Sequence, residues 1–240
     1  MGTLAVQVTG GRKSYPGRRE PVLDGIDLAV AAGETLAVLG ASGSGKSTLL
    51  RVLAGLDRLD GGGIDWAGAD TPPTTGTVFQ QPLLMPWLTV RDNILFGGRF
   101  ARHRAGFDRE HAIGLLARFG LGELAGRYPD QLSGGQAQRV SVIRAAAVRP
   151  RLLLLDEPFS ALDPAVRADL QDWLRELVAE LFCTTVLVTH DVDEALRLAD
   201  RIVLIGPGAA VREDVRLTGE DPVSVRERIV AGYRETVVPA

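Results

Sequence analysis

The feature that most constrains the fold of this chain is a glycine-rich octapeptide, GASGSGKS at residues 40–47, placed between an apolar run and a helical pattern. Residues 35–39 have the composition of a buried strand, and residues 46–54 have that of a helix that Gly55 ends. The octapeptide matches G-x-x-x-x-G-K-S, whose glycines allow backbone N–H groups to surround phosphates. We therefore predict a strand, a phosphate-binding loop and a helix, with Lys46 reaching the β and γ phosphates and Ser47 ligating Mg²⁺.

A second glycine-rich loop of similar size lies at residues 132–136, with the sequence LSGGQ. Its serine hydroxyl, its glycines and a helix that begins at Gly135 offer hydrogen-bond donors and a positive dipole end to an anion. Two such loops in one chain suggest a nucleotide that is held from two sides.

Composition indicates a folded globular protein with a sizeable core, because the chain has 240 residues and 45% of them are hydrophobic. The net charge of −3, with both signs interspersed, lacks the basic field that non-specific nucleic-acid binding needs, so DNA as the main partner is disfavoured. The single cysteine, Cys183, cannot form an internal disulfide and fits a reducing cytoplasm. We find no secretory leader and no window of roughly 20 apolar residues, so we expect a chain that reaches a membrane only by docking onto another protein.

The order of the predicted elements is that of an α/β protein. Residues 4–9 and 26–30 read as half-buried strands, a further strand ends at Val78 and Phe79, and residues 90–148 form a helical insert. The later elements alternate between strand and helix, at residues 152–155, 164–181 with Asp163 as N-cap, 184–189, 192–199 and 202–205. This alternation predicts a mostly parallel sheet, and the tail from Gly206 predicts a short closing helix.

A carboxylate pair follows the apolar run at residues 152–155. Four leucines at residues 152–155 describe a buried strand that delivers Asp156 to its carboxyl edge, where open α/β sheets bind ligands. We predict that Asp156 binds magnesium directly or through its second shell. Glu157 points in a different direction and is available to polarise water as a general base, although a glutamate here is equally compatible with a helix start.

Taken together, the two loops and the Asp156-Glu157 pair resemble the ATP-binding cassette family. The resemblance implies that Gln80, or in a less favoured register Gln81, touches Mg²⁺ or the attacking water and senses a transmembrane partner. It implies that His190 contacts the γ-phosphate and that the segment ending at Asp163 crosses between subunits. Tyr15 is similar to the aromatic residue that stacks on adenine, with simple packing as the alternative.

The resemblance also implies a fold and an assembly. The fold is a single domain over residues 1–240, with a P-loop NTPase core and an N-terminal antiparallel β subdomain in residues 1–89 and 149–240, and an inserted α-helical subdomain at about 90–148. The assembly is a head-to-tail dimer, expected to be a homodimer, that encloses two ATP molecules, each between the first loop of one chain and the second loop of the other.

The implied site residues fall into three groups. The residues expected to be catalytic are Glu157, His190, Gln80 and Lys46. Those expected to bind Mg²⁺ are Ser47, Gln80 and Asp156. The residues expected to bind ATP are Tyr15, Gly40, Ala41, Ser42, Gly43, Ser44, Gly45, Lys46, Ser47, Thr48, Ser133, Gly134, Gly135, Gln136 and Asp163.

The segment from Gln80 to Ile94 resembles importers of the nitrate, sulfonate and taurine group, in which it grips a membrane subunit. The implied function is an ATPase subunit that powers uptake of a small solute. It would lie peripherally on the cytoplasmic face of the membrane, bound to permease subunits. An extracytoplasmic solute-binding protein would deliver the solute to these subunits. Trp87 contacts the membrane subunit or packs within the insert. Two departures from the family pattern are a short segment between Asp60 and Val78, and Ala137 where Arg or Lys is common.

Three other functions fit less of the sequence. A cassette ATPase acting on DNA or ribosomes would need long coiled coils or two cassettes in one chain, and an exporter cassette is commonly fused to a membrane domain. A plain P-loop kinase or GTPase would leave residues 132–136 unexplained.

Overall fold

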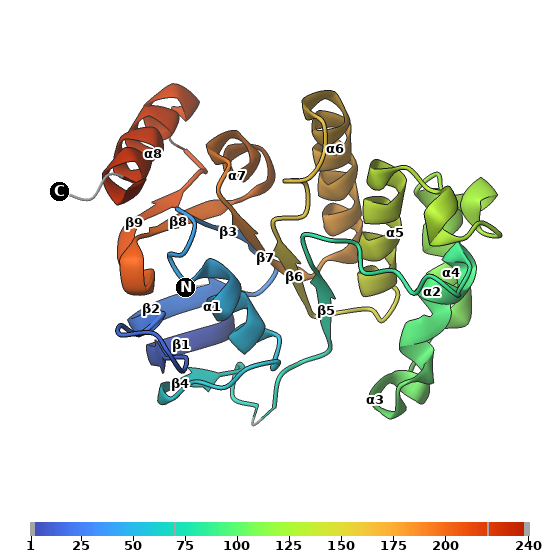
Figure 1. Cartoon of the computed structure of the whole chain (residues 1–240), viewed down its shortest axis with the longest axis horizontal. Coiled ribbons are helices and arrows are strands. Elements are labelled where there is room, and N and C mark those ends of the chain that lie inside the picture. Colours follow the sequence, from blue (N-terminus) through green and yellow to red (C-terminus); the bar gives the residue numbers. More distant parts are fainter. Residues whose placement is uncertain (1–2, 70, 220, 238–240) are drawn as a thin grey trace. The chain divides into compact units, whose positions relative to one another are not determined.

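The computed structural model of this chain describes residues 3–69, 71–219 and 221–237. The chain forms two compact units, the first made of residues 1–73 and 184–240 and the second of residues 74–183. Figure 1 shows the strands and helices of each unit. The predicted helical subdomain, at about 90–148, falls inside the second unit, and its boundaries stay a prediction.

A three-stranded antiparallel sheet opens the first unit. The strands β1 (Leu4–Lys13), β2 (Leu23–Ala31) and β4 (Gly61–Asp65) lie in the order β2-β1-β4. Alternate side chains such as Val6 and Val8 are buried, as expected of strands with one face on a core. The predicted N-terminal antiparallel subdomain is therefore confirmed.

The first unit also contains a mostly parallel group of strands that carries the glycine loop. The strand β3 (Thr35–Gly40) pairs in parallel with β7 (Thr184–Thr189) on one side and with β8 (Arg201–Ile205) on the other, and β9 (Val211–Arg216) pairs antiparallel with β8. Residues 36–39 are fully buried because β3 is central. The helices of this unit are α1 (Lys46–Leu53), α7 (Val192–Leu198) and α8 (Pro222–Val237), with a short 3₁₀ turn at Pro207–Ala209.

The second unit joins two parallel strands to a group of helices. The strands β5 (Thr75–Val78) and β6 (Leu152–Asp156) pair in register, with Val78 opposite Leu155. The α-helices are α2 (Val90–Leu95), α3 (Ala101–Arg104), α4 (Arg109–Arg118), α5 (Gly134–Ala146) and α6 (Pro164–Leu181), and 3₁₀ turns lie at Phe96–Arg99, Gly122–Leu124 and Pro129–Gln131. A Cβ on Gly76 would lie 2.5 Å from the carbonyl oxygen of Ala145, so β5 packs closely on α5. Within the described residues, no helix combines the length and apolar composition that a membrane crossing requires.

Most sequence-based elements agree with the structure, and the tail is the exception. The helix at 164–181 and the strand at 184–189 have the predicted bounds. Strand β9 was not predicted, because only Val215 of its residues is buried and the others carry no clear alternation. The closing helix is present as α8, with 16 residues.

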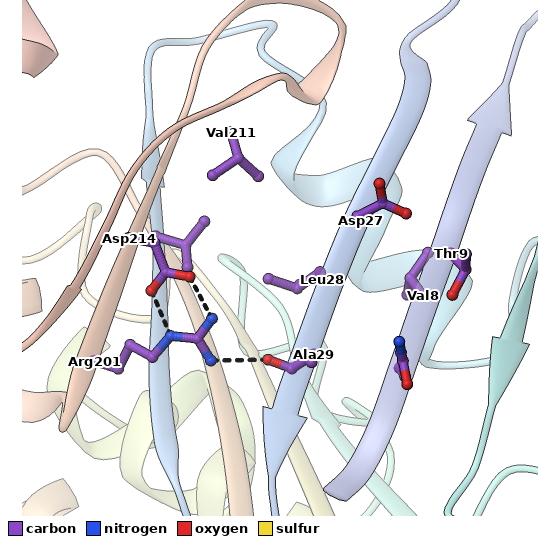
Figure 2. Close-up of a pocket in the computed structure, with 10 residues that line it drawn as sticks. Val8, Thr9, Asp27, Leu28, Ala29, Arg201, Val211 and Asp214 are labelled. Carbon is purple, nitrogen blue, oxygen red and sulfur yellow. Dashed lines mark hydrogen bonds and ion pairs between the residues drawn. The ribbon is translucent and has the colours of Figure 1, made fainter.

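A buried cation holds the two sheets of the first unit together. The side chain of Arg201 is only 12% exposed and donates from Nε and Nη2 to the carboxylate of Asp214 at 2.6 Å each. Its Nη1 donates to the carbonyl of Ala29 on β2 at 2.9 Å (Figure 2). The same Nη1 lies 3.5 Å from Oε1 of Glu34. The Asp214 hydrogen bonds raise the pKa of Arg201 above its usual value. Arg201 therefore connects β2, β8 and β9 through one guanidinium.

We predict that Arg201→Met lowers the free energy of unfolding by about 2–3 kcal/mol, because it leaves the buried Glu34 carboxylate and the Ala29 carbonyl without their donor, while the half-exposed Asp214 is partly rehydrated. Urea unfolding measures this loss. Arg12→Met is the control, since Arg12 pairs with Asp24 at 3.7 Å with both side chains more than half exposed, and we expect a change within about 0.5 kcal/mol. Equal losses for the two variants would contradict the proposed role of Arg201.

Candidate nucleotide site

The glycine loop is shaped by two positions where a side chain does not fit. A Cβ on Gly40 would lie 2.5 Å from the carbonyl oxygen of Ile205, and one on Gly45 would lie 2.6 Å from that of Val22. Gly43 and Gly45 also have φ of 83° and 102°, in the left-handed region that favours glycine. The loop between β3 and α1 therefore has this tight form because its glycines permit it.

The start of α1 presents donors that suit an anion. Its N-cap is Gly45, which has no side chain that could accept a hydrogen bond from the first turn. The hydroxyl of Ser44 is buried without a hydrogen-bond partner among the described residues. The Nζ of Lys46 donates to the carbonyls of Gly40 and Ala41 at 2.8 and 2.9 Å, which keeps the ammonium at the loop. These groups fit the phosphates of a nucleotide, and the exposed Ser47 hydroxyl beside them fits Mg²⁺.

Tyr15 is fixed by a network that the sequence did not reveal. Its hydroxyl donates to Oδ2 of Asp57 at 2.6 Å, and Nζ of Lys13 lies 5.5 Å from its ring centroid. Lys13 also pairs with Asp57 at 3.1 Å and with Asp60 at 3.0 Å. The Tyr15 hydrogen bond lowers the pKa of Asp57, and the hydrogen bonds to Asp60 and Asp57 raise the pKa of Lys13. This network holds the ring in one orientation, which a stacking residue needs.

His190 reaches the same sheet edge as the glycine loop. Because Leu39 on β3 pairs with Thr189 on β7, Gly40 and His190 each follow the paired positions at the carboxyl ends of adjacent parallel strands. The His190 side chain is exposed. The next residue, Asp191, caps α7 by accepting from the backbone N–H groups of Asp193 and Glu194 at 2.9 and 3.1 Å. The turn that carries His190 is therefore well anchored.

In the second unit, the parallel pair of β5 and β6 brings three predicted residues to one edge. Gln80 lies two positions beyond Val78, and Asp156 and Glu157 lie one and two positions beyond its partner Leu155. Glu157 has φ of 45°, a strained conformation for a residue other than glycine. Such strain is concentrated at functional sites, and it turns Glu157 away from the strand direction that Asp156 keeps. Its carbonyl accepts from the backbone N–H and the hydroxyl of Ser160 at 3.3 and 3.1 Å, which closes the turn.

The second glycine loop is a capping box at the start of α5. The hydroxyl of Ser133 accepts from the backbone N–H of Gln136 at 3.2 Å, and the side chain of Gln136 accepts from the N–H of Ser133 at 3.0 Å. The Ser133 hydroxyl can still donate its own proton. A Cβ on Gly135 would lie 2.9 Å from Cγ1 of Val166, whereas one on Gly134 would meet Leu162 at an ordinary 3.5 Å. Packing against α6 thus explains the glycine at 135 but not the one at 134.

Asp163 precedes the proline that begins α6, as predicted. It has N-cap geometry, but its side chain makes no capping hydrogen bond and is exposed. Asp163 therefore marks the start of the helix without stabilising it in the usual way, which leaves its carboxylate available for other contacts.

A buried asparagine organises the segment that was expected to grip a membrane subunit. Asn93 is 0% exposed, and its Oδ1 accepts from the backbone N–H of Met85 at 2.8 Å. Its Nδ2 donates to the carbonyls of Met85, Leu88 and Thr89 at 3.2, 3.1 and 3.1 Å. Trp87, in the middle of this turn, is 69% exposed, so it does not pack within the insert in this chain.

The structure thus places the predicted residues at element ends in both units. In the first unit, the octapeptide, Tyr15 and His190 lie on β1, β3, α1 and β7 or directly after them. In the second unit, the residues Gln80, Ser133, Gly134, Gly135, Gln136, Asp156, Glu157 and Asp163 lie at the ends of β5, β6, α5 and α6. Within the described residues, no group of three or more His, Cys, Asp or Glu side chains could hold a metal ion by itself. The individual roles stay predictions.

Comparisons with known proteins identify the family of this chain. A family model described as ABC transporter matches residues 23–160. The sulfate/thiosulfate import ATP-binding protein CysA of Nocardia farcinica is 47% identical over 209 residues, which cover 85% of this chain and 62% of that protein. The aliphatic sulfonates import ATP-binding protein SsuB of Ralstonia nicotianae is 49% identical over 207 residues, which cover 85% of this chain and 70% of that protein. The chain thus spans less than two thirds of the CysA protein it matches.

Solved structures agree with this result. A dimeric post-hydrolysis structure of the ATP-binding cassette MJ0796, bound to ADP and Pi, has a TM-score of 0.73 and 31% identity, covering 90% of this chain and all of that one. A nucleotide-free ATP-binding cassette from an ABC transporter has a TM-score of 0.81 at 23% identity, and this likeness supports the fold alone. The fold class and the family that the sequence indicated are both confirmed, and the chain belongs to the ABC transporter family.

Proposed function

We propose that this chain is the ATP-hydrolysing subunit of an importer and that it works as a head-to-tail dimer around two ATP molecules. The observation that carries the proposal is the glycine loop at 40–47, whose N–H groups, buried Ser44 hydroxyl and Lys46 ammonium form an anion site at the start of α1. The import direction is supported by the relatives CysA and SsuB, which are import ATP-binding proteins.

The proposed chemistry assigns a role to each group at the site. Mg²⁺ supplies positive charge that neutralises phosphate oxygens when it is bound, and Ser47, Gln80 and Asp156 would hold it. Lys46 and the loop N–H groups orient the β and γ phosphates. Glu157 accepts a proton from the attacking water, and His190 contacts the γ-phosphate. Tyr15 stacks on the adenine ring, in the orientation that Asp57 and Lys13 fix.

The proposed function also implies which partners the chain binds. A second copy of the chain would supply Ser133, Gly134, Gly135, Gln136 and Asp163 to each ATP, and the dimeric cassette MJ0796 supports such an arrangement. Membrane subunits would dock at the exposed Leu83 and Trp87, so the chain would lie peripherally on the cytoplasmic face of the membrane. An extracytoplasmic binding protein would deliver the solute to these membrane subunits. The relatives suggest sulfate, thiosulfate or an aliphatic sulfonate as the solute, and the sulfonate is within the nitrate, sulfonate and taurine group that the sequence suggested.

Glu157→Gln tests the proposed reaction directly. Because the amide cannot accept the proton of water, steady-state ATP hydrolysis should fall by about 10²–10⁴-fold, while the affinity for ATP stays within a factor of two or so. A malachite green phosphate assay and nucleotide binding by calorimetry measure the two quantities. Glu176→Gln on the exposed face of α6 is the matched control and should hydrolyse ATP normally. Unchanged single-turnover hydrolysis in Glu157→Gln would remove Glu157 from its role.

Mixed dimers test whether each site is shared between two chains. Ser133→Asp keeps a good N-cap for α5 but places a negative charge where the γ-phosphate would lie, so it separates capping from nucleotide contact. Lys46→Ala removes the charge from the first loop. Each variant alone should lose hydrolysis in both sites, whereas a mixture should regain one working site per mixed dimer, with about a quarter of the wild-type activity from random mixing and independent sites. Full activity of either variant alone would contradict a shared site.

The two glycines of the second loop should respond differently to alanine. A Cβ on Gly135 overlaps Val166, so Gly135→Ala should lower the free energy of unfolding by about 1–3 kcal/mol, and adding Val166→Ala should restore most of it. Gly134→Ala meets only an ordinary contact with Leu162 and should leave stability unchanged while hydrolysis falls. Thermal unfolding and phosphate release measure these effects. Normal hydrolysis by a dimer of Gly134→Ala would exclude a close approach of nucleotide at this position.

A further inference from the structure

Helix α5 connects the second glycine loop to the segment that contains the exposed Leu83 and Trp87. The helix begins after Ser133 and ends at Ala146. Near its middle, Nε2 of Gln138 donates to the carbonyl of Phe79 at 3.3 Å, and Gln138 is only 2% exposed. Two turns further along, Arg144 binds the same segment. One helix therefore contacts the residue before Gln80 and the second and third residues after it.

The contact made by Arg144 is unusual for an arginine. Its Nη2 donates to the carbonyl of Pro82 at 2.9 Å and its Nη1 donates to the carbonyl of Leu83 at 2.8 Å. Burial lowers the pKa of Arg144, and both of these acceptors are neutral backbone groups. The planar fork of a guanidinium fits two consecutive carbonyls, whereas the single ammonium of lysine is a point donor. The side chain therefore fixes the direction of two adjacent peptide groups.

This contact holds a strained and exposed turn. Leu83 has φ of 45°, a left-handed conformation that is unfavourable for a leucine. The conformation leaves the Leu83 side chain 53% exposed, near Trp87 in the chain, which is 69% exposed. Asn93 holds the other end of the turn through Met85, Leu88 and Thr89. The shape of residues 82–89 is thus set by two polar side chains, one from α5 and one from α2.

We propose that Arg144 is a positioning residue that transmits the movement of α5 to the partner-contact turn at residues 82–89. The inference rests on the proposed function, because it requires a membrane subunit at this turn and nucleotide at the start of α5. When the N-terminus of α5 engages ATP across the dimer, the helix carries the Pro82 and Leu83 carbonyls with it through Arg144. Gln138 holds Phe79 in the same way, so Gln80 and the turn would move together with the helix.

A purely structural role makes a different prediction. If Arg144 only stabilised the fold, its loss would lower hydrolysis and transport by the same factor, in step with a lower melting temperature. If it transmits movement, transport per ATP hydrolysed should fall while the hydrolysis of the isolated cassette is retained. The ratio of transport to hydrolysis therefore separates the two roles.

The test uses the complete transporter, that is the cassette co-purified with its membrane subunits and reconstituted into vesicles with its binding protein and radiolabelled sulfate or an aliphatic sulfonate. For Arg144→Met we expect basal hydrolysis of the isolated cassette within about twofold of wild type and transport per ATP lowered by about 3- to 30-fold, the range of coupling losses seen for residues between linked sites. Arg144→Lys should give an intermediate ratio, because it binds one carbonyl. Hydrogen exchange at residues 82–89 should be faster in both variants.

The control is Arg139→Met, the same substitution on the same helix. The guanidinium of Arg139 lies 5.4 Å from the ring centroid of Trp173 on α6, so its contact is with another helix and not with the carbonyls that Arg144 binds. It should lower the melting temperature without changing transport per ATP. An unchanged ratio in Arg144→Met, or equal losses of basal hydrolysis and transport, would overturn the inference. If Arg144→Met does not fold, Arg144→Lys decides by the same ratio. Absence of ATP-dependent uptake in the wild-type complex would instead reject the proposed function.

Discussion

Close backbone packing at the glycine loop is the constraint on which the first unit depends. Gly40 and Gly45 approach the carbonyls of Ile205 and Val22 so closely that no Cβ fits, and this packing curls the loop at the end of a fully buried strand. The N-cap of α1 is Gly45, which has no side chain to cover the N–H groups of the first turn. The N-terminus of the helix suits an anion, and the parallel pairing with β7 places His190 at the same edge. The shape of this candidate phosphate site is therefore a consequence of how the end of β3 is packed.

At the second glycine loop, the backbone N–H groups at the N-terminus of the helix are satisfied in another way. Its capping box satisfies two backbone donors with the side chains of Ser133 and Gln136, so the loop is stable without a ligand. What it offers to an anion is the Ser133 hydroxyl proton and the N–H groups of the two glycines. A loop that is complete alone but presents donors outward is suited to a site shared with another molecule, whereas the first loop has a glycine N-cap and a buried Ser44 hydroxyl without a partner among the described residues, which suits a bound anion.

Local sequence patterns predicted the secondary-structure elements and the residues at their ends. They could not predict contacts between residues that are far apart in the chain. The apolar runs before Gly40 and Asp156 and the Asp-Pro start of α6 are local signals, and the structure has these elements. Strand β9 was missed because its sequence is mostly charged and it exists through pairing with β8. The bond between Tyr15 and Asp57 spans 42 positions, and those from Arg144 to Leu83 and Pro82 span 61 and 62. Periodicity in the sequence does not reveal such pairs, so these contacts could not be predicted, whereas the elements that carry the candidate site residues could.

The unpredicted residues have a common physical character. Asn93 and Arg144 are polar groups that the fold removes partly or fully from water, and each is matched to backbone groups of the turn at 82–89. Apolar packing would stabilise such a turn with less desolvation, but it would tolerate several shapes, because hydrophobic contacts are not directional. Directional bonds to five backbone residues instead select one shape, including a left-handed leucine. A surface turn whose shape is specified so strictly, and whose largest side chain remains exposed, has the properties of a rigid contact element for a partner.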